Sequence, residues 1–223
     1  MRLQEMPKDV AERTALEAAR HPAAAPGVEL PAWYFRRWHF LPEGYLSRRS
    51  TALYDRLIRP VYWFGSEGRA ARLLTAWLAR TRAQRVLEVG AGPGRLLAAV
   101  LKRLPGIEGH AIDLSPWFVE MARRRLPGGT VEHADLAGYA ARGEQFDAVI
   151  ATHVLGHLPR SEQPAAAAAL GQLVAPGGSL LLIEHRWHRL PPDGMFGQGP
   201  KATRGLGFAR LLVFRQREEG GHQ

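Results

Sequence analysis

From residue 85 onward, short apolar runs alternate with amphipathic segments. The apolar runs lie at 85–90, 109–113, 130–134, 146–153 and 179–185. Runs of this length are typical of buried strands, and the segments between them have the 3.6-residue period of helices. A further run at 208–216 predicts a last, antiparallel strand. The pattern predicts an α/β fold with a doubly wound, mostly parallel sheet that helices cover on both faces.

The residues before 85 follow other patterns. Residues 1–30 carry a short amphipathic helical pattern that ends at HPAAAPG, which predicts a mobile N-terminal arm. Residues 31–84 hold aromatic and basic side chains at helical spacing, and they predict a helical cap that is too small for a core of its own. We expect residues 31–65 to form a mobile cover over a pocket, and residues 85–217 to form the ligand-binding domain.

One predicted helix of the cap has a marked apolar face. In the stretch TALYDRLIRPVYWF, the side chains of Leu53, Leu57 and Val61 recur at helical spacing. Pro60 lies within the same stretch and is expected to disturb the helix, because proline has no backbone N–H to donate. A second helix is predicted at about 66–80.

Length and composition limit the class of protein. The 223 residues have a mass of 24.7 kDa, which leaves room for one domain with a buried core. The absence of cysteine excludes disulfide scaffolds, cysteine-rich zinc sites and thiol nucleophiles. No apolar run approaches the ~20 residues that span a bilayer, and the charged start of the chain does not resemble a signal peptide. We therefore expect a soluble, cytoplasmic protein.

The charge of the chain is positive and unevenly distributed. The formal net charge is +9, and residues 36–85 contain eleven arginines and three acids, a local charge of +8. Such a segment can serve nucleic acid, anionic lipid or an acidic substrate. However, 27 of the 30 basic residues are arginine in a chain rich in Ala, Leu and Gly, which is also the signature of a codon bias. The charge alone therefore does not identify a partner.

A glycine-rich loop follows the first predicted strand. It runs Glu88-Val89-Gly90-Ala91-Gly92-Pro93-Gly94, and its three alternating glycines allow a tight turn and a close approach of backbone to a ligand. Arg95 occupies the place where a dinucleotide-binding loop has its third glycine, which disfavours NAD. The absence of a following Gly-Lys-Ser or Gly-Lys-Thr excludes a P-loop.

Three carboxylates accompany this loop. Asp113 ends the second strand, where it can accept both hydrogen bonds of a ribose diol. Asp135 follows the third strand, where it can accept from the exocyclic amino group of adenine. Glu88 precedes the glycines and can orient a cationic group. Carboxylates without accompanying phosphate-binding cations favour a nucleoside with an amino acid end over a pyrophosphate.

Five motifs in order now resemble one family. The runs VLEVGAGPGRLL, AIDLSPWFVEMARRR, VEHADL, FDAVIATHVLGHL and LVAPGGSLLLIEH resemble the class I S-adenosylmethionine-dependent methyltransferases over roughly residues 50–215. The stretch YDRLIRPVYWFG is similar to the small-molecule branch, which includes quinone-biosynthesis and phospholipid N-methyltransferases. The resemblance implies a Rossmann-like fold, S-adenosylmethionine as cofactor, and methyl transfer to a small-molecule or lipid-like acceptor.

The resemblance also implies which residues bind the cofactor. The glycine loop would hold the methionine part, Asp113 the ribose and Asp135 the adenine. Thr152 would lie below the methyl donor, and Tyr54 or Tyr62 would close over it. The implied set is Tyr54, Tyr62, Glu88, Gly90, Ala91, Gly92, Gly94, Asp113, Leu114, Asp135, Leu136 and Thr152.

Candidate catalytic residues follow the fourth strand. His153 and His157 are expected at the carboxyl edge of the sheet, and either can act as a general base if the acceptor loses a proton. The alternative for His157 is a hydrogen bond that only fixes its loop. Glu184, His185 and His188 have the composition of a metal site, but alternation along a strand turns the first two to opposite faces. We therefore predict no metal.

The cap leaves two interpretations open. Its densest aromatic group is Trp33, Tyr34, Phe35, Trp38 and Phe40. We expect most of these rings to form a small core that packs the cap onto the sheet. The alternative is a lid over an apolar acceptor, with arginines that face an acidic headgroup or a membrane surface. Those arginines are Arg36, Arg37, Arg48 and Arg49.

The sequence departs from the resembled family in one segment, and two alternative functions stay open. Residues 186–207 show no helical period, where the resembled branch usually has a further helix. The first alternative is an RNA methyltransferase, which is disfavoured because no Asn-Pro-Pro-Tyr-type motif and no cysteine nucleophile are present. The second is a cofactor-binding protein without catalytic activity. A peripheral membrane contact, the acceptor atom and the oligomeric state stay open.

Overall fold

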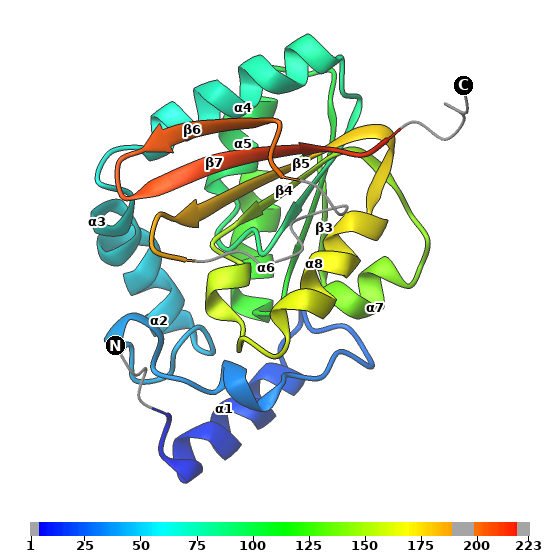
Figure 1. The fold of residues 1–223 in the computed structure, drawn as a ribbon. Helices are drawn as coiled ribbons and strands as arrows, with labels where there is room; N and C mark the ends of the chain where they lie inside the picture. The colour runs from blue at the N-terminus through cyan, green and yellow to red at the C-terminus, as the bar shows by residue number, and fades with distance from the viewer. Residues whose placement is uncertain (1–4, 189–198, 218–223) are drawn as a thin grey trace.

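A computed structural model of the protein describes residues 5–188 and 199–217. Its centre is a seven-stranded sheet with the order β3-β2-β1-β4-β5-β7-β6 (Figure 1). The strands are β1 Arg85–Val89, β2 Glu108–Asp113, β3 Thr130–His133, β4 Phe146–Thr152, β5 Val174–His185, β6 Ala202–Leu206 and β7 Ala209–Arg215. The first five pair in parallel, and β7 pairs antiparallel with both β5 and β6. The predicted doubly wound sheet is confirmed.

Helices cover both faces of the sheet. On one face lie α4 Glu67–Thr81, α5 Arg95–Leu101 and α6 Pro116–Arg125. On the other lie α7 Leu136–Ala140 and α8 Gln163–Gln172. Both faces are therefore sealed from water, which is why the parallel strands are almost continuously apolar.

Alternate residues of the central strands enter two separate cores. Ala148 and Ile150 of β4 pack with α4 and α5, whereas Val149 and Ala151 pack with α7 and α8. All four side chains are fully buried. This alternation fixes the register of the sheet, because a shift by one residue would exchange the two faces.

The edge strand β6 was not predicted from the sequence. Its residues ATRGL include three that are exposed, and only Leu206 is buried. An exposed edge strand needs no apolar run, so its pattern resembles a loop. The chain therefore has two antiparallel strands at this edge where the sequence indicated one.

The residues before the sheet are mainly helical. The predicted arm contains α1 Lys8–Ala19. The predicted cap contains η1 Ala32–Tyr34, η2 Trp38–Phe40, α2 Arg48–Leu53, η3 Tyr54–Ile58 and α3 Arg59–Trp63, whereas α4, at its end, packs on the sheet. The elements α2, η3 and α3 are continuous, and η3 is one turn of π-helix. The wider turn lies directly before Pro60, which cannot donate a hydrogen bond to the preceding turn.

The cap packs through aromatic rings, as the first interpretation of this group expects. Tyr34, Trp38 and Tyr45 are buried in one cluster with Trp117 and Phe118 at the start of α6. Ser115 caps that helix by accepting from the Phe118 amide, and Pro116 opens it.

Part of the predicted N-terminal arm contacts the domain. Met6 and Ala18 are buried in the same cluster, and the Ala25 amide donates to Nδ1 of His133 at 3.0 Å. The mobility of this arm and of the cap stays a prediction. Within the described ranges, no helix is long and apolar enough to cross a membrane.

Candidate active site

A cavity of about 600 Å³ opens at the carboxyl ends of the parallel strands. Its lining includes residues that directly follow β1, β3 and β4 and the last residues of β2. Because β1 lies between β2 and β4, this edge is the point where the chain order of the sheet reverses, and open α/β sheets bind ligands there. The cap closes the cavity from the opposite side.

The structure brings most of the sequence-predicted residues to this cavity. Those in its lining are Tyr54, Glu88, Gly90, Ala91, Gly92, Asp113, Leu114, Asp135, Leu136, Thr152, His153 and His157. Tyr62 and Gly94 are not in the lining. The ring of Tyr62 instead lies 4.2 Å from that of His39, measured between centroids. Of the two tyrosines proposed to close over the cofactor, only Tyr54 therefore lines the cavity.

The three glycines of the loop have different roles. All three have positive φ, which glycine adopts without strain. A Cβ added at Gly92 would meet no atom within 4 Å, so this residue leaves open space beside the loop. A Cβ at Gly90 would lie 2.8 Å from Val154, and one at Gly94 would lie 2.9 Å from Ala122 of α6. Gly94 thus allows close packing of α5 on α6, the role that a dinucleotide loop gives to its third glycine.

Backbone amides fix the carboxylate of Asp113. The Gly92 N–H donates to one of its oxygens at 2.7 Å, and the Ser115 N–H donates to the other at 2.8 Å. Burial raises the pKa of Asp113 to about 6, although both amides favour the charged form. Each oxygen keeps a lone pair for a further donor, which is what a ribose diol requires.

Asp135 follows β3, and the glycine loop follows β1. Because β2 lies between these strands, Asp135 and the loop lie at separate parts of the cavity. Asp135 is the N-cap of α7, where its Oδ1 accepts from the Gly138 amide at 2.7 Å. Its other oxygen is not used for capping. Leu114 and Leu136 line the cavity beside it, so this part offers apolar surfaces and one carboxylate.

Glu88 lies buried beneath the glycine loop. It accepts a hydrogen bond from the Leu97 amide at 3.2 Å, and its exposed fraction is 1%. Burial raises the pKa of Glu88 to about 8, although nearby Arg59 opposes this shift. At neutral pH the group is therefore mainly protonated, and a cationic partner would favour its carboxylate form.

Arg59 is a cavity residue that the sequence did not reveal. It comes from α3, its side chain is buried, and its guanidinium pairs with Glu67 at 2.8 Å. The sequence signal was one arginine among the charged and apolar residues of a helical stretch, which is too common to be informative. Among the described lining residues it is the one cation, and it faces five carboxylates. Those carboxylates are Glu29, Glu88, Asp113, Asp135 and Glu162.

The two predicted histidines differ in their surroundings. Nδ1 of His157 contacts the carbonyl oxygen of His153, so Nδ1 carries the proton and Nε2 is free to accept one. Burial lowers the pKa of His157. Burial and neighbouring histidines lower the pKa of His153 to about 2, and its Nδ1 is buried without a hydrogen-bond partner. His157 therefore has the better arrangement for a base.

A third histidine, from the cap, lies near His157 but is not in the lining of the cavity. His39 lies 6.0 Å from His157 between ring centroids, and burial lowers its pKa to about 3. His185, at the end of β5, stacks on His153 at 4.2 Å. Sequence reasoning missed His39, because nothing local indicates that the cap folds back onto the loop after β4.

Glu184 holds the loop after β4 in place. One oxygen of its fully buried carboxylate accepts from the Leu155 amide at 2.9 Å, and the other lies 3.3 Å from Nδ1 of His188. His185 turns to the other side, against His153. Among residues 5–188 and 199–217, no group of three or more side chains is arranged as metal ligands.

The cap bridges the cavity from one side to the other. The indole N–H of Trp33 donates to Glu162, the residue before α8, at 2.6 Å. The four arginines proposed to face an acceptor headgroup do not line the cavity. Arg48 instead borders a separate cavity of about 300 Å³ between α2 and α6.

Comparisons with known proteins agree with this site. Residues 86–178 match the family described as a methyltransferase domain. The uncharacterized protein YjhP of Escherichia coli K12 is 36% identical over 116 residues, 48% of this chain and 44% of that protein. A trans-aconitate 2-methyltransferase of Methylobacterium nodulans is 34% identical over 125 residues, 54% of this chain and 47% of that protein. The chain spans about half the length of the curated relatives it matches.

A solved structure shares the fold and part of the sequence. It is the S-adenosylmethionine-bound structure of CalS10, an amino pentose methyltransferase from Micromonospora echinaspora. The TM-score is 0.52 at 26% identity, covering 74% of this chain and 70% of that one. The domain match over residues 86–178, the sheet order and this likeness support the resemblance to the class I S-adenosylmethionine-dependent methyltransferases. The finer resemblance to the quinone and phospholipid branch stays a prediction.

Proposed function

We propose that the protein transfers a methyl group from S-adenosylmethionine to a small-molecule or lipid-like acceptor. The observation that carries this proposal is the open space at Gly92 between the buried Glu88 and the amide-held Asp113. A nucleoside with a cationic amino acid end requires this combination of backbone space and carboxylates. The bound cofactor of CalS10, whose fold the domain shares, supports the same assignment.

Each part of the cofactor has a complementary group in the cavity. Glu88 would accept from the α-amino group, and Arg59 would donate to the α-carboxylate. Asp113 would accept from the ribose hydroxyls. The adenine would lie between Leu114 and Leu136, with Asp135 accepting from its amino group.

The same arrangement opposes a dinucleotide. Arg95, at the start of α5, pairs with Asp55 at 2.5 Å. Asp55 is buried and also pairs with Arg125, so neither arginine is free for a phosphate. Arg59 is paired with Glu67, so the described lining offers no unpaired arginine to a pyrophosphate.

In methyl transfer, the side chains of the cavity mainly position the acceptor, because the methyl group arrives activated. S-adenosylmethionine supplies a methyl group that is already activated on a sulfonium. The cavity must hold an acceptor in line with that methyl and exclude water. If the acceptor carries a proton, Nε2 of His157 would accept it, because Nδ1 is already committed to the His153 carbonyl. His153, whose pKa is about 2, would shape the wall instead.

The charge of the cavity favours uncharged or cationic acceptors. Glu29 and Glu162 line it and are not assigned to the cofactor, Arg59 is paired with Glu67, and the other wall is aromatic. A tricarboxylate such as the trans-aconitate named for one relative would meet net repulsion here. The rings of Tyr34, Trp38 and Tyr45 favour a planar or apolar acceptor that they can contact face to face.

An acceptor panel tests this function. The protein would be incubated with S-adenosylmethionine and uncharged, cationic and polyanionic aromatic or lipid-like acceptors, with release of S-adenosylhomocysteine as the readout. We expect turnover with uncharged or cationic members and none with polyanions. Tight cofactor binding without turnover on any member would instead favour a non-catalytic binding protein.

A further inference from the structure

Large apolar side chains gather on one end of the molecule. In the part of the chain that the structure describes, eight such side chains are exposed, and seven of them belong to this end. They are Phe40, Leu53, Leu57, Val61, Phe64, Trp187 and Phe208, with exposed fractions from 41% to 72%. We call these seven residues the apolar patch. The eighth residue, Leu16, lies on α1.

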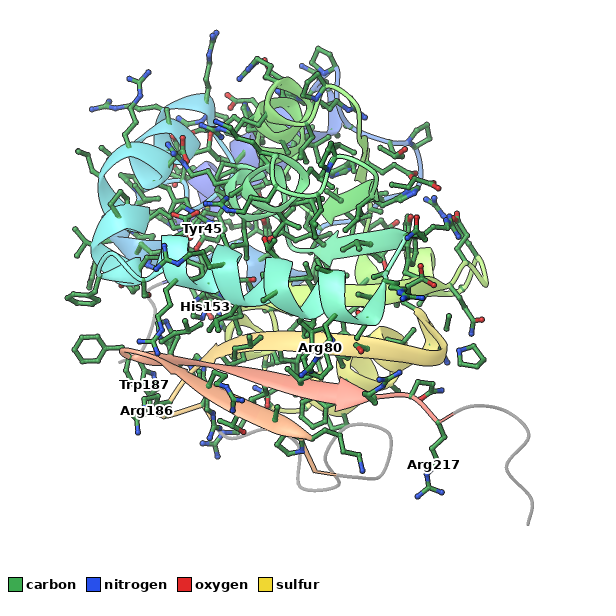
Figure 2. The ribbon with its side chains drawn as sticks, turned by 90° about the horizontal axis from the view of Figure 1, so that it is seen from above. Tyr45, Arg80, His153, Arg186, Trp187 and Arg217 are labelled. Atoms are coloured by element: carbon green, nitrogen blue, oxygen red, sulfur yellow. The ribbon has the colours of Figure 1, made fainter. Side chains whose placement is uncertain are left out.

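Ring contacts join the parts of the patch that are distant in sequence. Phe64, which ends α3, lies 4.6 Å from Phe208 in the turn between β6 and β7. Trp187 lies 6.4 Å from Phe208, again between ring centroids. Figure 1 shows α3 and the β6–β7 turn on the same side of the molecule, and Figure 2 shows Trp187 and Arg186 at that end of the hairpin.

The helical part of the patch is the apolar face that the sequence indicated. Leu53, Leu57 and Val61 share one side of the continuous α2–η3–α3 segment, and that side faces solvent. The opposite side supplies Trp63 and Arg59 to the interior. Single exposed apolar residues are ordinary, but a contiguous group of this size marks a contact surface.

Positive charge surrounds the patch. Arg49 and Arg56 lie on the same helical segment, and Arg186 precedes Trp187; all three are exposed. The one acid between residues 48 and 64 is Asp55, and its buried carboxylate is already paired with two arginines. The patch therefore combines apolar side chains with flanking arginines, and within residues 5–188 and 199–217 none of these three arginines forms an ion pair.

We propose that the apolar patch binds the surface of an anionic membrane. The apolar side chains would enter the interfacial region, and the flanking arginines would contact lipid phosphates. A second copy of this chain fits less well, because a two-fold contact would bring the arginine flanks of both copies together. An anionic bilayer satisfies the apolar and the charged groups at once.

The patch adjoins the wall of the active-site cavity. Trp187 stacks on His185 at 4.5 Å, and His185 stacks on His153, which lines the cavity. Membrane binding would therefore hold the cavity close to a lipid-like acceptor. That consequence rests on the proposed function, whereas the membrane contact itself does not.

Vesicle co-sedimentation tests the proposal without any methyl acceptor. The probes are vesicles of phosphatidylcholine alone and vesicles with one quarter phosphatidylglycerol. We expect the protein to bind the anionic vesicles and to bind much less to the neutral ones. The variant Leu57→Glu/Val61→Glu should weaken binding by at least about tenfold, and Arg49→Glu/Arg56→Glu by a similar factor, since each basic residue near a charged surface contributes about fivefold.

Leu16→Glu is the matched control, because Leu16 is 58% exposed on α1 and outside the patch. It should bind vesicles like the unchanged protein, and all variants should keep the melting temperature and the cofactor affinity. Failure of the unchanged protein to bind anionic vesicles would overturn the proposal. So would equal loss of binding in the control, or a dimer in sedimentation equilibrium that Leu57→Glu/Val61→Glu dissociates.

Discussion

The two walls of the cavity are built in different ways. The sheet side consists of carboxylates that backbone amides hold in place, as the Gly92 and Ser115 amides hold Asp113. The cap side consists of aromatic rings and one arginine that are held by packing against each other and against α6. A backbone-held wall keeps its geometry when side chains elsewhere change. We infer that the sheet side binds most of the cofactor, with Arg59 as the cap's contact to it, and that the aromatic rings of the cap select the acceptor.

The largest expected effect concerns the open space on the sheet side. Gly92→Val should lower S-adenosylmethionine affinity by at least about 100-fold, because the new side chain would fill the ligand space. Gly143→Val is the matched control: φ at Gly143 is +75°, close to the +54° at Gly92, and a Cβ there also meets no atom within 4 Å. Both variants should lose similar stability from backbone strain. Equal affinities in calorimetry would remove Gly92 from the cofactor site.

A smaller effect is expected where the two walls meet. His157→Ala should lower kcat by about 100-fold with an acceptor that loses a proton, and it should leave cofactor affinity unchanged. His153→Ala should lower kcat much less, because a group with a pKa of about 2 is a poor base at neutral pH. Steady-state kinetics gives kcat for both variants. A larger loss of kcat in His153→Ala than in His157→Ala would make His153 the general base.

Glu88 should make the cofactor affinity depend on pH. Its pKa of about 8 means that it carries a proton at pH 7, and a cationic amino group would displace that proton on binding. Cofactor affinity should therefore rise from pH 6 to pH 7, by up to about tenfold. Calorimetry at pH 7 in two buffers of different ionisation enthalpy should show proton release. Glu88→Gln should abolish the release, and persistence of the full signal in that variant would assign it to another group.

The smallest effect is expected on the cap side. Trp33→Phe removes the hydrogen bond to Glu162 that joins the cap to the start of α8, while it keeps an aromatic ring. Cofactor dissociation should become faster by only a few-fold, because one partly exposed hydrogen bond is lost. Stopped-flow measurement checks the rate. An effect as large as that of Gly92→Val would mean that the cap also carries cofactor binding.

The sheet side was predictable because its signals are local. The apolar runs, the glycines and the acid at the end of β2 each lie within a few residues of the turn they define. The cap side was not, because Arg59 reaches the cavity, and His39 reaches His157, only when distant segments pack together. The sequence could not tell whether Tyr54 or Tyr62 lines the cavity. The π-helical turn before Pro60 changes which side of the helix each residue faces, and residue spacing does not predict such a turn. The edge strand β6 was missed because exposure removes the apolar pattern.

The central claim is that the amide-held carboxylate at the end of β2 binds the ribose of S-adenosylmethionine. Asp147 offers a close control, because its carboxylate also accepts from two backbone amides, those of Gln84 and Arg85, but lies outside the cavity. Calorimetry should show that Asp113→Asn loses most of the cofactor affinity, that Asp147→Asn keeps it, and that the unchanged protein does not bind NAD. Unchanged affinity in Asp113→Asn, or binding of NAD, would contradict the account.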